Sequence, residues 1–271
     1  MKDETCWING IQSKKLSLTD RTIHFGDGFF TTTRVINGKI HLLSWHLERL
    51  LLAANRLLFA PFDVIALREE MLIAAKTSNK NNGVVKVLIS RGEGNRGYSF
   101  KNCNSPTRIV FYSPYPRGYL KWRQNGIRLC KSPIRLTRNP LLAGIKHNNR
   151  LEQIMIRAHM EPTGADEALV LDSEGKVVEC ISANLFWRKG LEVFTPKIYY
   201  AGVSGVMRRH VISVLPTLGY SLSEVLVGPN ALEVAEEVFI TNSLLPLASV
   251  KEIDGRHYND KTLYLQLSLL C

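Results

Sequence analysis

The chain carries the stretch AGIKHNNR at residues 143–150, directly ahead of an apolar periodicity that predicts a helix over 149–158. Small and apolar residues precede Lys146, so its amine is expected to be partly desolvated. Desolvation lowers the pKa of a lysine and makes its amine competent for Schiff-base chemistry. Judged alone, the same residues fit a solvated lysine in a basic loop even better. Lys146 is therefore a candidate nucleophile, and the choice between a nucleophilic and a solvated lysine depends on the rest of the sequence.

Turn signals and apolar periodicity divide the remaining sequence into short strands and a few helices. Asn-Gly pairs at 9–10 and 37–38 predict hairpins, because these residues tolerate the positive φ angles of tight turns. Apolar residues at 47, 50, 51, 54, 57 and 58 predict one face of a helix that ends near Pro61. Further helices are expected at 64–76 and 204–215, and a polar loop at 77–83. Further strands are expected at 84–90, 108–113, 127–131, 167–172, 176–180, 184–187, 192–195 and 238–241.

These elements indicate an α+β fold without the regular strand–helix alternation of a dinucleotide-binding domain. The segment 92–97 formally matches GxGxxG, but loop-like residues follow where that motif needs a helix N-terminus. Prolines at 114 and 116 exclude a helix or a central strand there. We therefore predict a small N-terminal α/β domain over 1–113, a linker over 114–122 and a larger C-terminal α/β domain over 123–271.

Composition narrows the class of protein. Lys and Arg outnumber Asp and Glu by 35 to 24, a net charge of +11, but they form no blocks, which favours small anionic ligands over nucleic acid. The five cysteines are scattered and the histidines lack metal-site spacing, so we expect reduced thiols and no metal. No apolar run reaches the length of a membrane span and no signal peptide is evident, so a cytoplasmic protein without a membrane contact is expected.

Three further positions are suited to binding charged groups. Glu179 lies between apolar neighbours and calls for a cationic or protonated partner, unless it is simply an exposed strand residue. Ser204 precedes a predicted helix, whose first amides and the serine hydroxyl suit an anion, although a plain N-cap explains it equally. Ser243 follows a predicted strand in the run TNS at 241–243, which fits either a phosphate or a turn.

The order of these segments resembles the fold-type IV pyridoxal-phosphate enzymes, which include the class IV and D-amino acid aminotransferase-like proteins. The matching segments are FGDGFFTTTR at 25–34, HLERL at 46–50, AGIK at 143–146, ECISANLF at 179–186, GVSG at 202–205 and TNS at 241–243. The resemblance extends over residues 7–250. Within the family, the stretches 94–98, 140–153 and 165–172 are most similar to aminodeoxychorismate lyases.

The resemblance implies a two-domain fold, pyridoxal 5'-phosphate as the cofactor and a role for each matching residue. Lys146 would bind the cofactor covalently and transfer the proton, with Thr32 facing the cofactor beside it. Glu179 would face the pyridine nitrogen and keep it protonated. The phosphate-binding positions would be Arg49, Val203, Ser204 and Ser243. By helical spacing alone Arg49 lies opposite the leucine stripe on a solvated face, so its role depends on the resemblance.

Substrate-binding residues are also implied. Arg96 would bind a substrate carboxylate, in a loop that in the family reaches toward the other subunit of a homodimer, and Arg91 and Tyr98 are weaker candidates. Asn242 replaces a glycine of the branched-chain enzymes, which favours a polar cyclic substrate. Those enzymes also carry a tyrosine five residues after the lysine, where this chain has Leu151.

The implied activity is a lyase reaction that converts 4-amino-4-deoxychorismate, a small anionic substrate, to 4-aminobenzoate and pyruvate in folate synthesis. An aminotransferase for D-amino or branched-chain amino acids is the alternative on the same fold. A basic nucleic-acid-binding protein is the alternative from another class.

Overall fold

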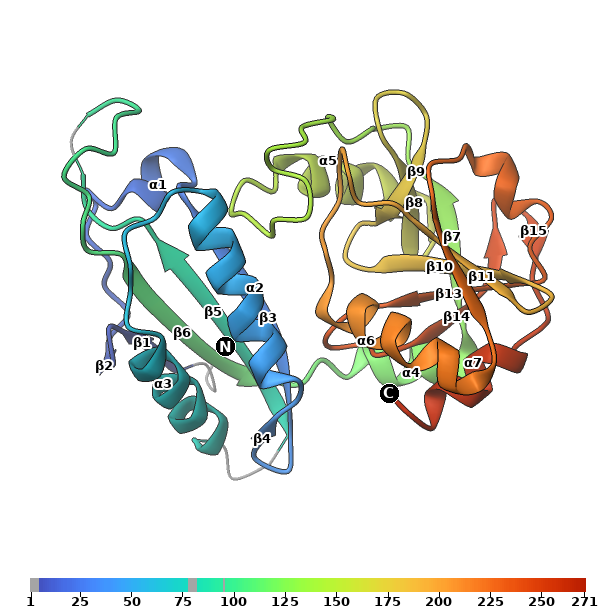
Figure 1. Cartoon of the computed structure of the whole chain (residues 1–271), viewed down its shortest axis with the longest axis horizontal. Helices are drawn as coiled ribbons and strands as arrows, with labels where there is room; N and C mark the ends of the chain where they lie inside the picture. The colour runs from blue at the N-terminus through green and yellow to red at the C-terminus, as the bar shows by residue number, and fades with distance from the viewer. Residues whose placement is uncertain (1–4, 78–81, 95) are drawn as a thin grey trace. The chain divides into compact units, whose positions relative to one another are not determined.

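The computed structural model describes residues 5–77, 82–94 and 96–271. The chain forms two compact units (Figure 1): unit 1 takes the residues up to Pro116 together with Lys146–Asn149, and unit 2 consists of Arg117–Ile145 and Arg150–Cys271. Both units combine helices with mainly antiparallel sheet, which confirms the predicted α+β class. Residues 78–81 of the predicted loop at 77–83, and Asn95 of the glycine-rich segment, lie outside the described residues.

Unit 1 is built on an antiparallel sheet in the order β2-β1-β6-β5-β3-β4. Its strands are β1 (Thr5–Ile8), β2 (Ile11–Gln12), β3 (Gly28–Ile36), β4 (Lys39–Ile40), β5 (Gly83–Ser90) and β6 (Thr107–Pro114). Its helices are α1 (Arg21–Phe25), α2 (Leu43–Arg56) and α3 (Val64–Lys76). Both predicted hairpins are confirmed: Asn9 and Asn37 have φ angles of 48° and 49°, and β1 pairs with β2 as β3 pairs with β4.

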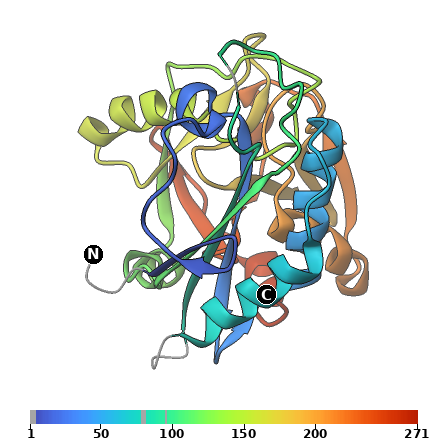
Figure 2. The same ribbon diagram turned by 90° about the vertical axis from the view of Figure 1, so that its left-hand side faces the viewer.

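The sheet of unit 1 has one buried and one more open face, because side chains alternate along each strand. On β3, Phe29, Thr31, Thr33 and Val35 are buried, whereas Phe30, Thr32 and Arg34 are half-buried. Helices α2 and α3 pack on this sheet (Figures 1 and 2), with α2 against β3 and α3 against β5 and β6. The open face therefore carries Phe30, Thr32 and Arg34 of the FGDGFFTTTR segment.

The buried face of α2 differs from the predicted leucine stripe. The buried residues are His46, Leu50, Ala53 and Ala54, while Leu51 and Leu58 are 44% and 68% exposed. The helix turns this face inward because small alanines allow close approach to β3 and His46 meets Thr31 there. Arg49 lies next to this face and is half-buried, so placing it on a solvated face was wrong.

Unit 2 contains a nine-stranded sheet in the order β12-β11-β10-β13-β14-β7-β8-β9, with β15 paired to β14. Its strands are β7 (Ile127–Lys131), β8 (Glu167–Leu171), β9 (Val177–Cys180), β10 (Asn184–Lys189), β11 (Glu192–Pro196), β12 (Ser221–Val225), β13 (Glu237–Thr241), β14 (Ala248–Ile253) and β15 (Arg256–His257). Its helices are α4 (Gly118–Asn125), α5 (Leu151–Met160), α6 (Val206–Val214) and α7 (Thr262–Ser268), with short 3-10 turns η1 (Glu161–Thr163), η2 (Leu215–Leu218) and η3 (Pro229–Leu232). Within unit 2, α6 and α7 bury Val211, Leu263 and Leu267 against the stacked rings of Phe186 and Phe239.

The segment expected to be a linker is largely helical. α4 begins at Gly118 and packs on β14, so residues 118–122 belong to unit 2 rather than to an extended connection. The residues Lys146–Asn149 also depart from the expected sequence division, because they join the sheet of unit 1 while both flanking segments belong to unit 2. Among the described residues, no helix has the length and apolar character needed to cross a bilayer.

Candidate active site

Lys146 is fixed to the first residues of β3 by backbone pairing. The Phe30 amide donates to the Lys146 carbonyl at 2.9 Å, and the Asn148 amide donates to the Gly28 carbonyl at 2.9 Å. The Lys146 side chain is half-buried, and its Nζ lies 4.8 Å from the centre of the Phe30 ring. Lys146, the last residue of the AGIK segment, therefore meets the FGDGFFTTTR segment in unit 1.

A hydroxyl and a second lysine lie on the same open face of this sheet. Thr32 and Phe30 share that face by strand alternation, and Thr32 lies directly opposite Lys86 on β5. Lys86 Nζ is 5.1 Å from the Phe30 ring, and burial lowers the pKa of Lys86. The amines of Lys146 and Lys86 thus lie near one aromatic ring, and Thr32 shares the sheet face of that ring.

Arg49 forms a cationic site beneath the opposite face of β3. Its guanidinium donates a short hydrogen bond to the Thr31 hydroxyl, which lies 2.6 Å from His46 Nδ1. Burial and the neighbouring Arg49 lower the pKa of His46 well below its ordinary value, so a neutral His46 can accept from Thr31. Thr31 and His46 thereby fix the guanidinium, a role that the sequence analysis assigned to neither residue.

The Arg49 site lacks an anion in the protein itself. Arg49 Nε is fully buried and has no hydrogen-bond partner among the described residues, where no carboxylate pairs with the guanidinium either. Burial lowers the pKa of Arg49 to about 10, which leaves it charged at neutral pH. A buried, charged guanidinium with an unused donor fits a phosphate group, which would supply the missing anion.

Replacing Arg49 with glutamine is expected to weaken cofactor binding. Losing charge-assisted hydrogen bonds to a phosphate costs about 2 kcal/mol, equivalent to about thirtyfold weaker binding. Titration of cofactor-stripped protein with pyridoxal phosphate, followed by absorbance, measures the change. Arg56→Gln removes the same charge from an exposed position on the same helix and should bind the cofactor as the wild type does. Equal affinities for both variants would exclude the phosphate role of Arg49.

In unit 2, Glu179 is locked to the turn that carries the GVSG segment. Glu179 is 5% exposed, and its Oε2 accepts from the Val203 amide at 2.8 Å and from Asn184 Nδ2 at 3.4 Å. Asn184 Nδ2 also donates to the Val203 carbonyl at 2.9 Å. Gly202 has a φ of 91°, and a Cβ there would lie 2.7 Å from a methyl of Val178. The carboxylate is therefore held in one orientation by the Val203 amide and by Asn184, which the sequence analysis did not single out.

The same turn is joined to the chain immediately ahead of Lys146. The Gly144 amide donates to the Gly202 carbonyl at 2.8 Å, and the Ser204 amide donates to the Gly144 carbonyl at 3.0 Å. These bonds, with that of Val203 to Glu179, use the two amides that were predicted to bind a phosphate. α6 begins only at Val206, so the unused amides of a helix N-terminus follow Ser204, and Ser204 can contribute its exposed hydroxyl.

Arg150 provides a positive charge for Glu179 inside unit 2. The Arg150 side chain is half-buried, and its Nε is buried without a hydrogen-bond partner among the described residues. Burial lowers the pKa of Arg150, while the negative charges of Glu179 and Glu152 oppose that shift. The positive charge of Arg150 therefore lies near enough to Glu179 for the two side chains to attract each other. In the sequence, the one sign of a role for Arg150 is its place four residues after Lys146.

Glu167 fixes the residues that follow Glu179. One Glu167 oxygen accepts from the Ile181 amide at 3.0 Å, and the other accepts a short hydrogen bond from the Ser182 hydroxyl. Burial raises the pKa of Glu167 in spite of these hydrogen bonds. The carboxyl group consequently keeps its proton to higher pH in the folded chain than in the unfolded chain.

This shift predicts a pH-dependent stability difference. Above pH 4.5, the ordinary pKa of a glutamate, the native state binds more protons than the unfolded state. The contribution of the protonated Glu167 to the free energy of unfolding is therefore complete below pH 4.5. It is lost as the pH rises through the pKa of Glu167 in the folded chain. Glu167→Gln keeps one oxygen that can accept from the Ile181 amide, and its amide nitrogen can donate to the Ser182 hydroxyl. Because the substitution removes the titration, the variant should gain stability relative to the wild type between pH 5 and pH 8. Urea unfolding at both pH values tests this. A constant difference would contradict it.

The substrate candidates fall into two groups. Arg96 is exposed and Tyr98 is 86% exposed, so both are accessible to a ligand. Arg91 is 5% exposed, and its guanidinium is engaged by Asp27 and by the carbonyls of Leu57 and Leu58. Arg91 is therefore a structural residue, and assigning it to the substrate was wrong.

Asn242 and Ser243 follow β13 in unit 2. Asn242 Oδ1 accepts from the amides of Leu244 and Leu245, so its oxygen caps the loop and only its amide nitrogen can act on a ligand. Ser243 is half-buried, and its hydroxyl has no hydrogen bond to another described residue. The described residues also hold no cluster of three or more His, Cys, Asp or Glu side chains arranged for a metal ion.

Comparison of the sequence and the structure with known proteins shows the family of this chain. The chain is 36% identical to an aminodeoxychorismate lyase from Vibrio harveyi, over 92% of this chain and 91% of the relative. It is 30% identical to a putative branched-chain-amino-acid aminotransferase from Methanocaldococcus jannaschii, over 91% and 85%. The crystal structure of 4-amino-4-deoxychorismate lyase from Pseudomonas aeruginosa superimposes with a TM-score of 0.91 at 37% identity, covering 97% of each chain. The pattern of the amino-transferase class IV family matches residues 28–253, and the chain belongs to that family, as the resemblance predicted.

Proposed function

We propose that this chain is a pyridoxal-phosphate-dependent lyase that converts 4-amino-4-deoxychorismate to 4-aminobenzoate and pyruvate. The observation that carries the proposal is the near full-length similarity to two aminodeoxychorismate lyases at 36% and 37% identity. Fold alone could not support it, because one fold serves several reactions. Leu151 adds to it, since this position is a tyrosine in the branched-chain enzymes that the sequence resembles less.

The residues that the family resemblance assigns to the cofactor would each have one role. Lys146 would bind it covalently, and Arg49 and the hydroxyls of Ser204 and Ser243 would bind its phosphate. Glu179, oriented by the Val203 amide, would keep the pyridine nitrogen protonated. When bound, pyridoxal phosphate withdraws electrons from the amine-bearing carbon of the substrate.

The protein groups would then move one proton. Once the substrate amine has displaced Lys146, the free Nζ can take the proton from the amine-bearing carbon. The bond between the ring and the enolpyruvyl oxygen breaks, and the departing enolpyruvate receives one proton to become pyruvate. No water or oxidant is consumed, so the atoms of the two products equal those of the substrate. Thr32 lies on the same face of the sheet as Phe30, and the family resemblance places its hydroxyl beside the cofactor during this proton transfer.

Anionic groups of the substrate would meet the exposed cations of unit 1. Arg96 would bind a carboxylate, with Tyr98 beside it, and the amide nitrogen of Asn242 would contact the substrate ring. Lys86 is available on the same face as Thr32. A net charge of +11 accords with an anionic substrate and an anionic cofactor.

A class IV aminotransferase for branched-chain or D-amino acids is the second candidate, favoured by the 30% identity to the Methanocaldococcus jannaschii relative. An aminotransferase requires a keto acid to regenerate its cofactor, whereas the lyase does not. To separate the two, we would supply the protein with chorismate, glutamine and an aminodeoxychorismate synthase and follow 4-aminobenzoate. Product formation supports the lyase. A protein that makes none, but transfers the amino group of leucine or D-alanine to 2-oxoglutarate, is an aminotransferase.

We also propose that the enzyme acts in the cytoplasm as a homodimer with no nucleic-acid or membrane partner. The family loop that carries Arg96 reaches toward a second subunit, which is the ground for the dimer. Light scattering coupled to gel filtration should give twice the mass of 30.6 kDa. A monomer with full lyase activity would contradict the dimer.

A further inference from the structure

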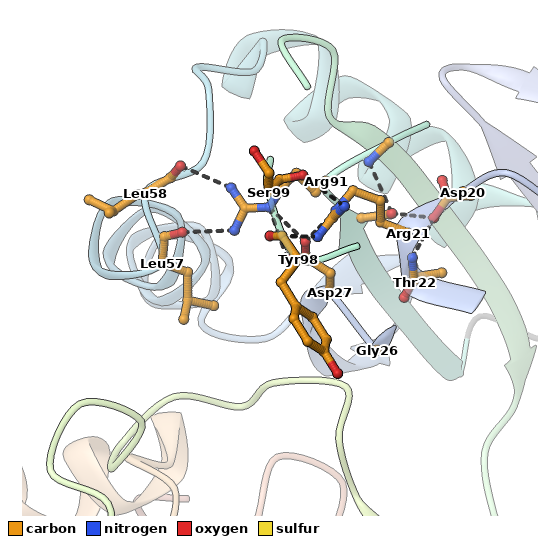
Figure 3. A network of polar contacts seen from close by, with 12 residues as sticks. Asp20, Arg21, Thr22, Gly26, Asp27, Leu57, Leu58, Arg91, Tyr98 and Ser99 are labelled. Carbon is orange, nitrogen blue, oxygen red and sulfur yellow. Dashed lines mark hydrogen bonds and ion pairs between the residues drawn. The ribbon is translucent and has the colours of Figure 1, made fainter. Parts of the chain in front are cut away.

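Arg21 donates hydrogen bonds to the loop that carries Arg96 and Tyr98. Its guanidinium donates to three successive carbonyls, those of Gly97 at 3.1 Å, Tyr98 at 3.3 Å and Ser99 at 3.2 Å (Figure 3). Arg21 is only 3% exposed although it carries a full charge. Burying a guanidinium against backbone carbonyls is costly unless a carboxylate offsets the charge.

Asp27 is that carboxylate, and it serves two arginines. Arg21 Nε lies 2.8 Å from Asp27 Oδ2, and Arg91 Nε lies 2.8 Å from the same oxygen (Figure 3). The two other nitrogens of Arg91 donate to the carbonyls of Leu57 and Leu58, each at 2.9 Å. Asp27 therefore joins the loop after Gly97 to the end of α2 through two fixed forks of hydrogen-bond donors.

Aromatic contacts reinforce both arginines. The Arg91 guanidinium lies between two rings, 4.0 Å from the centre of Phe59 and 4.3 Å from the centre of Phe100. The Arg21 guanidinium lies 4.7 Å from the Phe25 ring, which also lies 5.6 Å from the Tyr98 ring. Tyr98 is thus held at its carbonyl by Arg21 and at its ring by Phe25.

The two segments joined by these arginines form the walls of a cavity of about 720 Å³ in unit 1. One wall comes from residues 58–60 and the other from residues 98–104. Arg91 anchors the first wall through the Leu58 carbonyl, and Arg21 anchors the second through the carbonyls of Tyr98 and Ser99. We call Arg21, Asp27 and Arg91 the clamp, because together they fix the separation of the walls.

We propose that Arg21 is a positioning residue which, through the clamp, holds the loop at 96–99 so that Arg96 meets the carboxylate of the substrate. The proposal rests on the proposed function, in which Arg96 binds that carboxylate. Arg21 touches neither substrate nor cofactor in this account. Its effect is on the placement of a neighbouring group, and displacing such a group by about 1 Å can cost about a hundredfold in rate.

The test compares Arg21→Met with Arg21→Lys. Methionine removes the charge and all the hydrogen bonds, whereas lysine keeps a charge for Asp27 but cannot reproduce the planar fork that spans three carbonyls. We expect both variants to raise KM for aminodeoxychorismate about tenfold or more with a smaller change in kcat and unchanged cofactor content. We also expect trypsin to cut after the exposed Arg96 faster than in the wild type, while R21K retains more thermal stability than R21M.

A matched control separates positioning from general loosening of unit 1. Arg108 and Glu70 form a comparably buried ion pair at 2.7 Å in the same unit. Among the described residues, the hydrogen bonds of Arg108 go to Asn9 and Glu70 and not to the 96–99 loop. Arg108→Met should lower thermal stability but leave KM and the trypsin cut after Arg96 at wild-type values.

Three outcomes would overturn the proposal: wild-type KM and cleavage in both Arg21 variants, equal effects in R108M, or full restoration of KM by R21K, which would mean that Arg21 only neutralises Asp27. If R21M does not fold, R21K carries the same test. A wild type without lyase turnover would sink the proposed function, and the trypsin comparison would still decide whether Arg21 orders the loop.

Discussion

Replacing Lys146 with alanine should abolish 4-aminobenzoate release and leave no cofactor attached to the chain. Lys146 is the residue that pairs with Phe30 at the start of β3 and places its amine against the Phe30 ring. Alanine removes both the covalent link and the proton-transfer base, so we expect the rate to fall by at least about 10³-fold. Borohydride reduction followed by peptide mass spectrometry should locate the cofactor on Lys146 in the wild type and nowhere in the variant.

Lys86 offers the matched control for this experiment. Its amine lies beside the same ring, at 5.1 Å, and burial lowers its pKa. Lys86→Ala should keep the cofactor bound to Lys146 and retain measurable turnover, because Lys86 is assigned no covalent role. Cofactor trapped on Lys86, or product from K146A at the wild-type rate, would remove Lys146 from the chemistry.

Replacing Glu179 with glutamine should lower kcat by about 10²-fold, because an uncharged amide no longer keeps the pyridine nitrogen protonated. The variant is well suited to the question, since the glutamine oxygen can still accept from the Val203 amide and leave the turn in place. Arg150 keeps Glu152 but loses Glu179 as a negative neighbour, so its positive charge is less compensated and disfavours a protonated pyridine nitrogen further. Steady-state kinetics with cofactor content measured in the same samples distinguishes slower chemistry from lost cofactor.

Glu237→Gln is the control for removing a buried carboxylate. Glu237 is fully buried on β13 and accepts from the amides of Leu263 and Tyr264 and from Arg188. This variant should be less stable than the wild type but retain its kcat at saturating cofactor. A similar loss of kcat in both variants would show that charge removal from the sheet, and not the position of Glu179, is responsible.

Local signals in the sequence predicted the elements whose causes are local. The hairpins at 9–10 and 37–38 follow from Asn-Gly pairs, and the prediction of a helix over 64–76 coincides with α3. β14 and α7 escaped prediction because their apolar residues are explained only by partners distant in the chain. Leu263 and Leu267, for example, pack on Phe186 and Phe239.

The candidate site shows the same limit. Arg49 reads as solvated on a helical wheel, and its burial becomes visible only when β3 brings Thr31 to its guanidinium. Arg91 reads as a free cation, although Asp27, distant in sequence, occupies it. Asn184 and Glu179 meet around the Val203 backbone, a contact that no spacing rule in the sequence anticipates. Recognition of the ordered motifs supplied the chemistry, and the structure supplied the partners that orient it.

The central claim is that this chain catalyses an elimination and not an amino transfer. The most direct test supplies a catalytic amount of the purified enzyme with aminodeoxychorismate in the absence of any keto acid, and measures pyruvate and 4-aminobenzoate together. We expect equal amounts of the two products over many turnovers, because the reaction leaves the cofactor unchanged. The absence of both products, with transfer of the substrate amine to added 2-oxoglutarate in their place, would contradict the account.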